Sequence, residues 1–159
     1  RTDGAELPAN MTYDWVNYRF FVRSDRRKLL SARLSSNFGH FYNGNRSRIG
    51  AGIDYRYQPY FTLALNAEYN KINLPSPYND ADLWLIGPRL DFTFTNNLFW
   101  TTFIQYNSQI ENLGLNTRLQ WRFKPVSDFF IVFTDNYDTS LFEVKNRALI
   151  AKLTYWFNL

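Results

Sequence analysis

The residues of this sequence that could do chemistry are polar side chains that recur at every second position within alternating polar and apolar runs. If these runs are neighbouring strands, the polar side chains share one face and pair from strand to strand. Filling of that face by ion pairs is the favoured interpretation, and a ring that selects an anionic solute is the alternative. The candidates are Arg48, Asp54, Arg56, Glu68, Arg89, Asp91, Arg118, Gln120, Arg122 and Lys152.

Three of the acidic residues in these runs, Asp54, Glu68 and Asp91, invite comparison with glycoside hydrolases. That chemistry needs two carboxyl groups about 5–9.5 Å apart, one of them with a raised pKa, and nothing in the sequence supports such a pair. The single histidine, His40, and the absence of cysteine predict no metal site, no catalytic triad and no cofactor. The predicted external rim offers further carboxylates, without a Ser–His pair: Asp80, Asp82, Glu111, Asp135, Asp138 and Glu143.

The runs themselves have a period of two, which is typical of β-strands. In the clearest run Ile49, Ile53 and Tyr57 lie on one face, and Asp54 and Arg56 lie on the other. A single domain over residues 1–159 is expected, with a lead-in or external loop at residues 1–12 and about nine strands, within a range of eight to ten, over residues 13–159. The clear runs span 48–57, 61–70, 84–94 and 112–123, and weaker ones span 16–22, 30–38, 100–107, 129–135 and 151–157.

The composition excludes a bundle of membrane-spanning helices and does not suggest nucleic-acid binding. The mean hydropathy is −0.40, and no window approaches the ~18 consecutive apolar residues that a spanning helix needs. Aromatic residues make up 19% of the chain, and such residues favour strands and membrane interfaces. The net charge is +4, but lysine and arginine are scattered through the runs, so no nucleic-acid partner is predicted.

Strand length and side-chain volume favour a transmembrane barrel over a soluble one. The runs reach the ~9–11 residues that a tilted strand needs to cross a bilayer. Their large apolar side chains are too many for the interior of a small barrel, whereas the polar face suits a wet lumen. An antiparallel transmembrane β-barrel, integral to a bacterial outer membrane, is therefore expected. Tyr155 and Phe157, two positions apart in the last run, resemble the signal that barrel-assembly machinery reads.

The predicted connections alternate in length, as the periplasmic turns and external loops of outer-membrane barrels do. Short ones are expected at 24–28, 58–59, 95–97 and 124–127, and longer ones at 42–46, 72–82, 107–112 and 138–145. With a periplasmic C-terminus, nine strands place the lead-in outside the cell. Single-chain bacterial barrels normally have an even number of strands. Parity thus favours the C-terminal part of a larger barrel over a strand miscounted by one.

The end of the chain resembles a Bacteroidota outer-membrane family. The most telling stretch is LNTRLQWRFKPVSDFFIVFTDNYD at residues 115–138, followed by NRALIAKLTYWFNL at residues 146–159. Members carry an N-terminal domain that resembles family 9 carbohydrate-binding modules, then a large C-terminal barrel. The resemblance covers about the last sixty residues well and the earlier strands in pattern only. It implies that the sugar-binding-like domain lies outside this chain and links the chain to glycan handling.

Three functions are expected from these observations. The first is a membrane anchor or scaffold for a larger cell-surface protein or complex. The second is a passive channel for small or glycan-derived solutes, and the third is an outer-membrane hydrolase, a label that members of the similar family often carry although no catalytic motif is present. The expected partners are outer-membrane lipid, lipopolysaccharide, the barrel-assembly machinery and other outer-membrane proteins.

Overall fold

A computed structural model describes residues 12–157 of the chain, and the predicted lead-in at residues 1–11 lies outside this range. The described part is all-β, and none of it forms a helix long and apolar enough to cross a membrane. Its nine strands are β1 (Asn17–Arg23), β2 (Leu30–Phe41), β3 (Gly44–Tyr57), β4 (Phe61–Asn73), β5 (Ala81–Thr95), β6 (Leu98–Asn107), β7 (Asn112–Lys124), β8 (Ser127–Asp138) and β9 (Glu143–Thr154).

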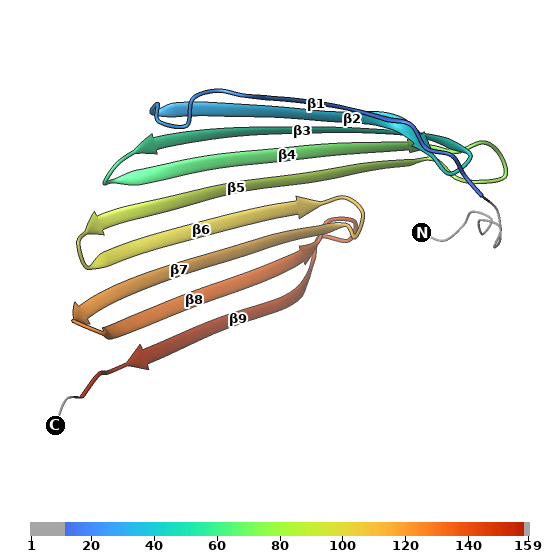
Figure 1. Cartoon of the computed structure of the whole chain (residues 1–159). Helices are drawn as coiled ribbons and strands as arrows, with labels where there is room; N and C mark the ends of the chain where they lie inside the picture. The colour runs from blue at the N-terminus through green and yellow to red at the C-terminus, as the bar shows by residue number, and fades with distance from the viewer. Residues whose placement is uncertain (1–11, 158–159) are drawn as a thin grey trace.

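The strands form one antiparallel sheet in which each strand pairs with the next in the chain, from β1 to β9 (Figure 1). The antiparallel all-β class and the expected nine strands are thereby confirmed. Strands β2 to β9 have between 10 residues, in β6, and 15 residues, in β5. Strands of soluble proteins usually have ~5–6 residues, so these are long by that standard and match the length that crosses a bilayer at a tilt.

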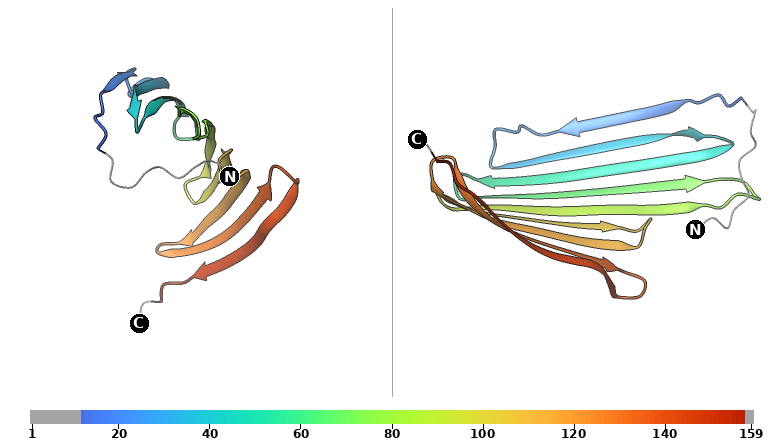
Figure 2. Two further views of the ribbon diagram at one scale, coloured as in Figure 1. Left: turned by 90° about the vertical axis from the view of Figure 1, so that its right-hand side faces the viewer. Right: turned by 90° about the horizontal axis from the view of Figure 1, so that it is seen from below.

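The sheet is open. Within residues 12–157, β1 pairs only with β2 and β9 pairs only with β8, and the views in Figure 2 show the two edge strands apart. The expectation of a closed barrel is therefore wrong for these nine strands taken alone. Alternation along a strand indicates which side chains share a face, but it does not indicate which strand, if any, pairs with the first or the last strand of the sheet. Because neighbours are antiparallel and both edge strands have odd numbers, β1 and β9 point the same way (Figure 1).

The sheet is a single layer without a core. No apolar side chain in the described part is fully buried, and the four buried residues are polar or charged: Ser31, Asn70, Ser127 and Asp135. The accessible surface is 11955 Å², whereas a compact protein of this mass exposes about 8,400 Å². The excess follows from a sheet that leaves both faces uncovered.

Connections at the two ends of the sheet differ, though not fully as the sequence predicts. We call the end with residues 24–29, 58–60, 96–97 and 125–126 the turn end, and the end with residues 42–43, 74–80, 108–111 and 139–142 the loop end. Two predictions are wrong: the connection at 42–46 is a two-residue turn at 42–43, and the one at 24–28 is a six-residue connection. In that connection, hydrogen bonds from Arg27 lower the pKa of Asp25.

Glycines let neighbouring side chains lie flat on one face of the sheet. Gly52 and Gly87 flank Asn66 in the same cross-strand row of β3, β4 and β5. A Cβ at Gly52 would lie 2.7 Å from the guanidinium carbon of Arg33, and one at Gly87 would lie 3.3 Å from the ring of Phe103. The missing side chains thus make room for an arginine and a phenylalanine from neighbouring strands.

Candidate functional site

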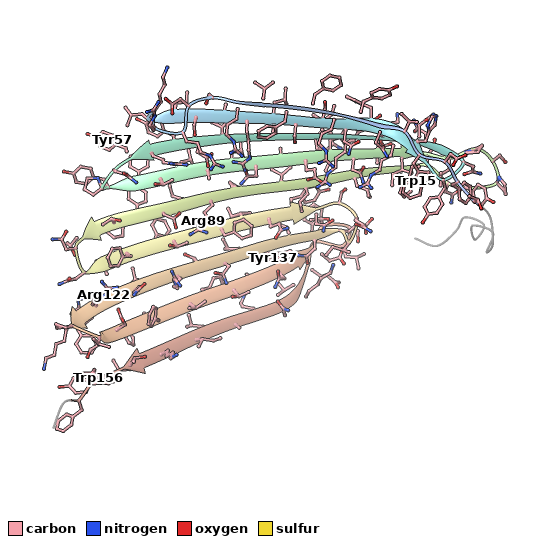
Figure 3. The ribbon with its side chains drawn as sticks, in the orientation of Figure 1. Trp15, Tyr57, Arg89, Arg122, Tyr137 and Trp156 are labelled. Carbon is pink, nitrogen blue, oxygen red and sulfur yellow. The ribbon has the colours of Figure 1, made fainter. Side chains whose placement is uncertain are left out.

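The register divides the sheet into an apolar face and a polar face. One cross-strand row of the apolar face contains Ile53, Leu65 and Pro88, and a later row contains Ile104, Leu115 and Asp135. On the opposite side, the register and the alternation along each strand bring together all ten polar residues singled out from the sequence. The polar face is therefore the candidate functional surface, and Figure 3 labels two of its arginines, Arg89 and Arg122.

Ion pairs link β2, β3 and β4 across the polar face. Arg48 of β3 lies 2.6 Å from the carboxylate of Glu68 on β4. Arg33 of β2 lies 3.3 Å from the carboxylate of Asp54 on β3 and also donates to Asn66 on β4. These side chains are partly exposed, so each pair stabilises the sheet by only ~0–1 kcal/mol. Their main effect is to neutralise these three charged strands locally, from β2 to β4.

A second group of polar contacts follows on β5 to β8. Arg89 pairs with Asp91 two positions along the same strand at 2.9 Å, and Thr101 of β6 donates to Asp91 at 2.8 Å. Arg118 of β7 lies directly opposite Thr101 in the register. Asp91 thus accepts from a charged donor and from a neutral donor, which together hold the carboxylate in place.

At the turn end of the polar face, the carboxylate of Asp128 is the acceptor for two neighbouring side chains. Gln120 donates to Asp128 at 3.0 Å, and Arg122 lies 3.5 Å from the same carboxylate. Neither Asp128 nor Arg33 stands among the residues that sequence reasoning selected. Asp128 falls next to a predicted turn and Arg33 falls in a weakly alternating run, but each occupies an alternate position of its strand. That alternation was the signal that could have found them.

Three basic residues predicted for the polar face, Arg56, Arg118 and Lys152, make no ion pair within the described residues. Arg56 donates to the backbone carbonyl of Arg26 at 3.5 Å, in the connection between β1 and β2. Lys152 lies opposite Phe130 in the register. The predicted ladder therefore runs through part of the sheet and does not reach β9.

Aromatic rings gather at the turn end. Phe61 lies between Tyr57 and Phe92, with ring centroids 5.8 and 5.4 Å away, and Phe123 lies 6.3 Å from Tyr155. Tyr155 and Phe157, the candidate assembly signal, belong to this aromatic belt, with centroids 6.5 Å apart. Their role as a signal stays a prediction.

The loop end carries aromatic rings as well. The rings of Tyr69 and Trp84 pack on the apolar face, tilted by 33° and with centroids 4.5 Å apart, and the Tyr69 hydroxyl donates to Asp82 at 2.5 Å. Figure 3 places Tyr57 at one end of the sheet and Tyr137 at the other, and the register puts both on the apolar face. Rings with a polar tip therefore flank the apolar face at both ends, as they do at both interfaces of membrane proteins.

Charges enter the apolar face near the loop end. Asp135 is 2% exposed, and its Oδ2 accepts from Arg147 at 2.7 Å and from the hydroxyl of Tyr137 at 2.8 Å. Its other oxygen is buried without a partner in the described part of the chain. The ion pair of Asp135 and Arg147 lies close to the loop end of β8, near the polar residues of the connections.

Carboxylates of the loops are engaged in local contacts. Asp80 accepts from the backbone N–H of Leu74 at 2.8 Å, and Asp138 pairs with Lys145 at 3.1 Å. Residues 12–157 contain no group of three or more potential metal ligands. Asp80 and Asp138, two of the acids considered for hydrolysis, thus hold loop segments in place in this structure.

Compared with known proteins, the chain matches no family model and no curated protein. The resemblance of residues 115–138 to a Bacteroidota outer-membrane family accordingly stays a prediction. The geometry of the two faces carries the functional argument.

Proposed function

We propose that this chain is a section of the wall of a bacterial outer-membrane β-barrel, with its apolar face toward lipid and its polar face toward the lumen. Its role is to anchor and support a larger cell-surface protein or complex. The single observation that carries the proposal is the apolar face itself. It extends over nine strands, and no apolar side chain in the described part is fully buried.

Lipid is the covering that best accounts for this face. Soluble monomers rarely expose apolar patches larger than a few hundred Å², whereas exposed residues here include Ile53, Leu65, Trp84 and Leu119 on four different strands. A charge at the bilayer midplane costs ~2–4 kcal/mol for arginine or lysine. The charged pair on the apolar face, Asp135 and Arg147, lies toward the loop end, where that cost falls.

The open edges require further strands. In lipid every backbone N–H and C=O needs a partner, so a spanning sheet must close. Because β1 and β9 point the same way, antiparallel closure takes an odd number of strands in addition to these nine. The proposed barrel is accordingly larger than the described sheet, with the loop end outside the cell and the turn end in the periplasm. In this setting the partners are outer-membrane lipid, lipopolysaccharide and the assembly machinery.

Spin labels on single cysteines test which face meets lipid. The chain has no native cysteine, so Leu65→Cys and its neighbour Asn66→Cys form a matched pair on opposite faces of β4. In the full protein reconstituted in bilayers, the label at Leu65 should collide with oxygen, which concentrates in lipid. The label at Asn66 should collide with a water-soluble nickel complex. Two labels that both favour nickel would overturn the proposal.

A passive channel is the second candidate, because the polar face is hollowed near its centre. A hollow of about 260 Å³ lies between Arg33, Glu68 and Phe103, over Gly50 and Gly87. Such space suits water and small solutes if the lumen is open. Conductance of the full protein across a planar bilayer separates the candidates, because an anchor with a filled lumen conducts nothing. Nothing in the geometry favours the third candidate, a hydrolase.

A further inference from the structure

Three arginines and two asparagines surround a hollow of the polar face near the loop end of β1, β2 and β3. The hollow has a volume of about 200 Å³. Arg19, Asn37 and Arg48 lie directly opposite one another across the three strands. Asn17 and Arg46 belong to the next row toward the loop end. Two adjacent rows therefore present guanidinium and amide groups to the same small space.

Aromatic rings form part of the wall of this hollow, and a glycine in the row of Asn17 and Arg46 leaves room for the Asn17 side chain. Gly39 lies between the strands of Asn17 and Arg46, and a Cβ there would lie 2.3 Å from the side-chain oxygen of Asn17. Trp15 and Phe41 line the hollow with ring centroids 6.1 Å apart. The guanidinium of Arg46 lies 5.4 Å from the centroid of Phe41, which holds this arginine against the wall.

The charge in the hollow is unbalanced. Arg48 has a carboxylate partner, Glu68, at 2.6 Å. Arg46 donates to the neutral amide of Asn70 at 2.8 Å, and Arg19 has no carboxylate within ion-pair distance in the described part of the chain. Three guanidiniums thus face one carboxylate, and an anion in the hollow would relieve their mutual repulsion.

We propose that this hollow binds a small organic anion whose carboxylate or phosphate bonds to Arg19 and Arg46 and whose ring lies on Trp15. A guanidinium fits the planar oxygen pairs of these groups with two parallel hydrogen bonds. The indole face suits a ring, and the volume equals roughly six or seven waters at about 30 Å³ each. The proposal goes beyond the proposed anchoring role and does not depend on it, because the hollow belongs to the polar face in any environment.

Calorimetric titration of the full protein in detergent tests the assignment with three probes: glucose 6-phosphate, inorganic phosphate and glucose. Glucose 6-phosphate should bind most tightly, and glucose should not bind measurably. Arg19→Ala and Arg46→Ala should each weaken glucose 6-phosphate binding by about tenfold or more. Trp15→Ala should weaken the sugar phosphate and leave inorganic phosphate unchanged. Circular dichroism checks the fold of each variant, and Arg46→Gln replaces Arg46→Ala if the latter does not fold.

Arg27→Ala is the matched control, because it removes one guanidinium from the turn end, where the side chain is 91% exposed. Its binding should equal that of the unmodified protein. An equal loss in Arg27→Ala, or no saturable binding of glucose 6-phosphate, would overturn the site. Equal affinity for inorganic phosphate and glucose 6-phosphate would overturn the proposal that the ligand carries a ring. The spin-label experiment fails or succeeds independently of these results, so the two proposals can be distinguished.

Discussion

Strands β3 and β4 separate polar from apolar side chains, whereas β8 and β9 carry apolar side chains on both faces. On the polar face, β3 presents Arg48 and Asp54, whereas β8 presents Phe130 and Val132 between Asp128 and Thr134. Val132 lies opposite Ile150 of β9, so the apolar character continues to the edge. Strands that are apolar on both faces are usually covered on both faces. The polarity of the polar face therefore decreases across the sheet. At β3 this face is suited to contact with water, and at β8 it is suited to packing against another part of the full protein.

Leu65→Arg should have the largest effect, because it places a charge in the middle of the apolar face of β4. We expect the free energy of unfolding in bilayers or micelles to fall by ~2–4 kcal/mol, measured by urea titration with a gel-shift readout of folded protein. Thr62→Arg, on the polar face of the same strand, is the control and should change stability little. Equal losses at the two positions would mean that β4 has no lipid-facing side.

Val132→Lys asks whether the polar face of β8 is covered. If Phe130 and Val132 pack against a covering in the full protein, the substitution should lower the free energy of unfolding by about 1–3 kcal/mol. The same titration measures it. An unchanged stability would place this part of the face in water, like β3, and would remove the contrast between the two regions.

Glu68→Gln tests whether the polar face at β3 and β4 is hydrated. Arg48 and Glu68 are 50% and 33% exposed, so water screens their attraction and the loss should be about 0.5 kcal/mol. A double-mutant cycle with Arg48→Gln isolates the pairwise energy. A coupling of several kcal/mol would contradict a hydrated polar face and indicate that the pair is shielded in the full protein.

Gly87→Ala should have the smallest effect. Its added methyl group would meet the ring of Phe103 at 3.3 Å, a contact that a small ring movement relieves, and we expect a change within about 0.5 kcal/mol. Gly52→Ala is the sharper companion, because its methyl group would approach the guanidinium of Arg33 to 2.7 Å and disturb the pair with Asp54. If the two alanine variants have the same melting temperature in thermal unfolding, the glycines are not needed to make room for Arg33 and Phe103.

The clear runs of the sequence predicted strand positions and faces because every second side chain experiences the same surroundings. Ile49 and Asp54 thus fell on the correct faces from their spacing alone. The run FFIVF of residues 129–133 has no alternation, so the face of Phe130 came only from the register with β7. The two-residue turn at 42–43 was missed because Gly44 and Arg46 look like loop residues until their pairing with β2 is known.

The open edges of the sheet and the hollow between β1, β2 and β3 could not be predicted from the sequence. The hollow joins Trp15 and Arg19 with Arg46 of β3, and their proximity depends on the register between strands, which spacing within one strand does not contain. The ion pair of Arg33 with Asp54 was hidden for the same reason. The side chains of β1 and β9 do not indicate that these strands lie at the edges of the sheet, because strands pair through backbone N–H and C=O groups.

Every strand of the sheet pairs only with its neighbours in the chain, and this has a consequence for how the protein forms and changes. Each hairpin closes a connection of two to seven residues, so the entropic cost of loop closure is small and native contacts are local. The sheet can grow one hairpin at a time from an existing edge. Adding or deleting a hairpin at an edge preserves the direction of that edge and leaves every interior pairing intact. Duplication of a two-strand unit is therefore a simple evolutionary route to a wall of different width.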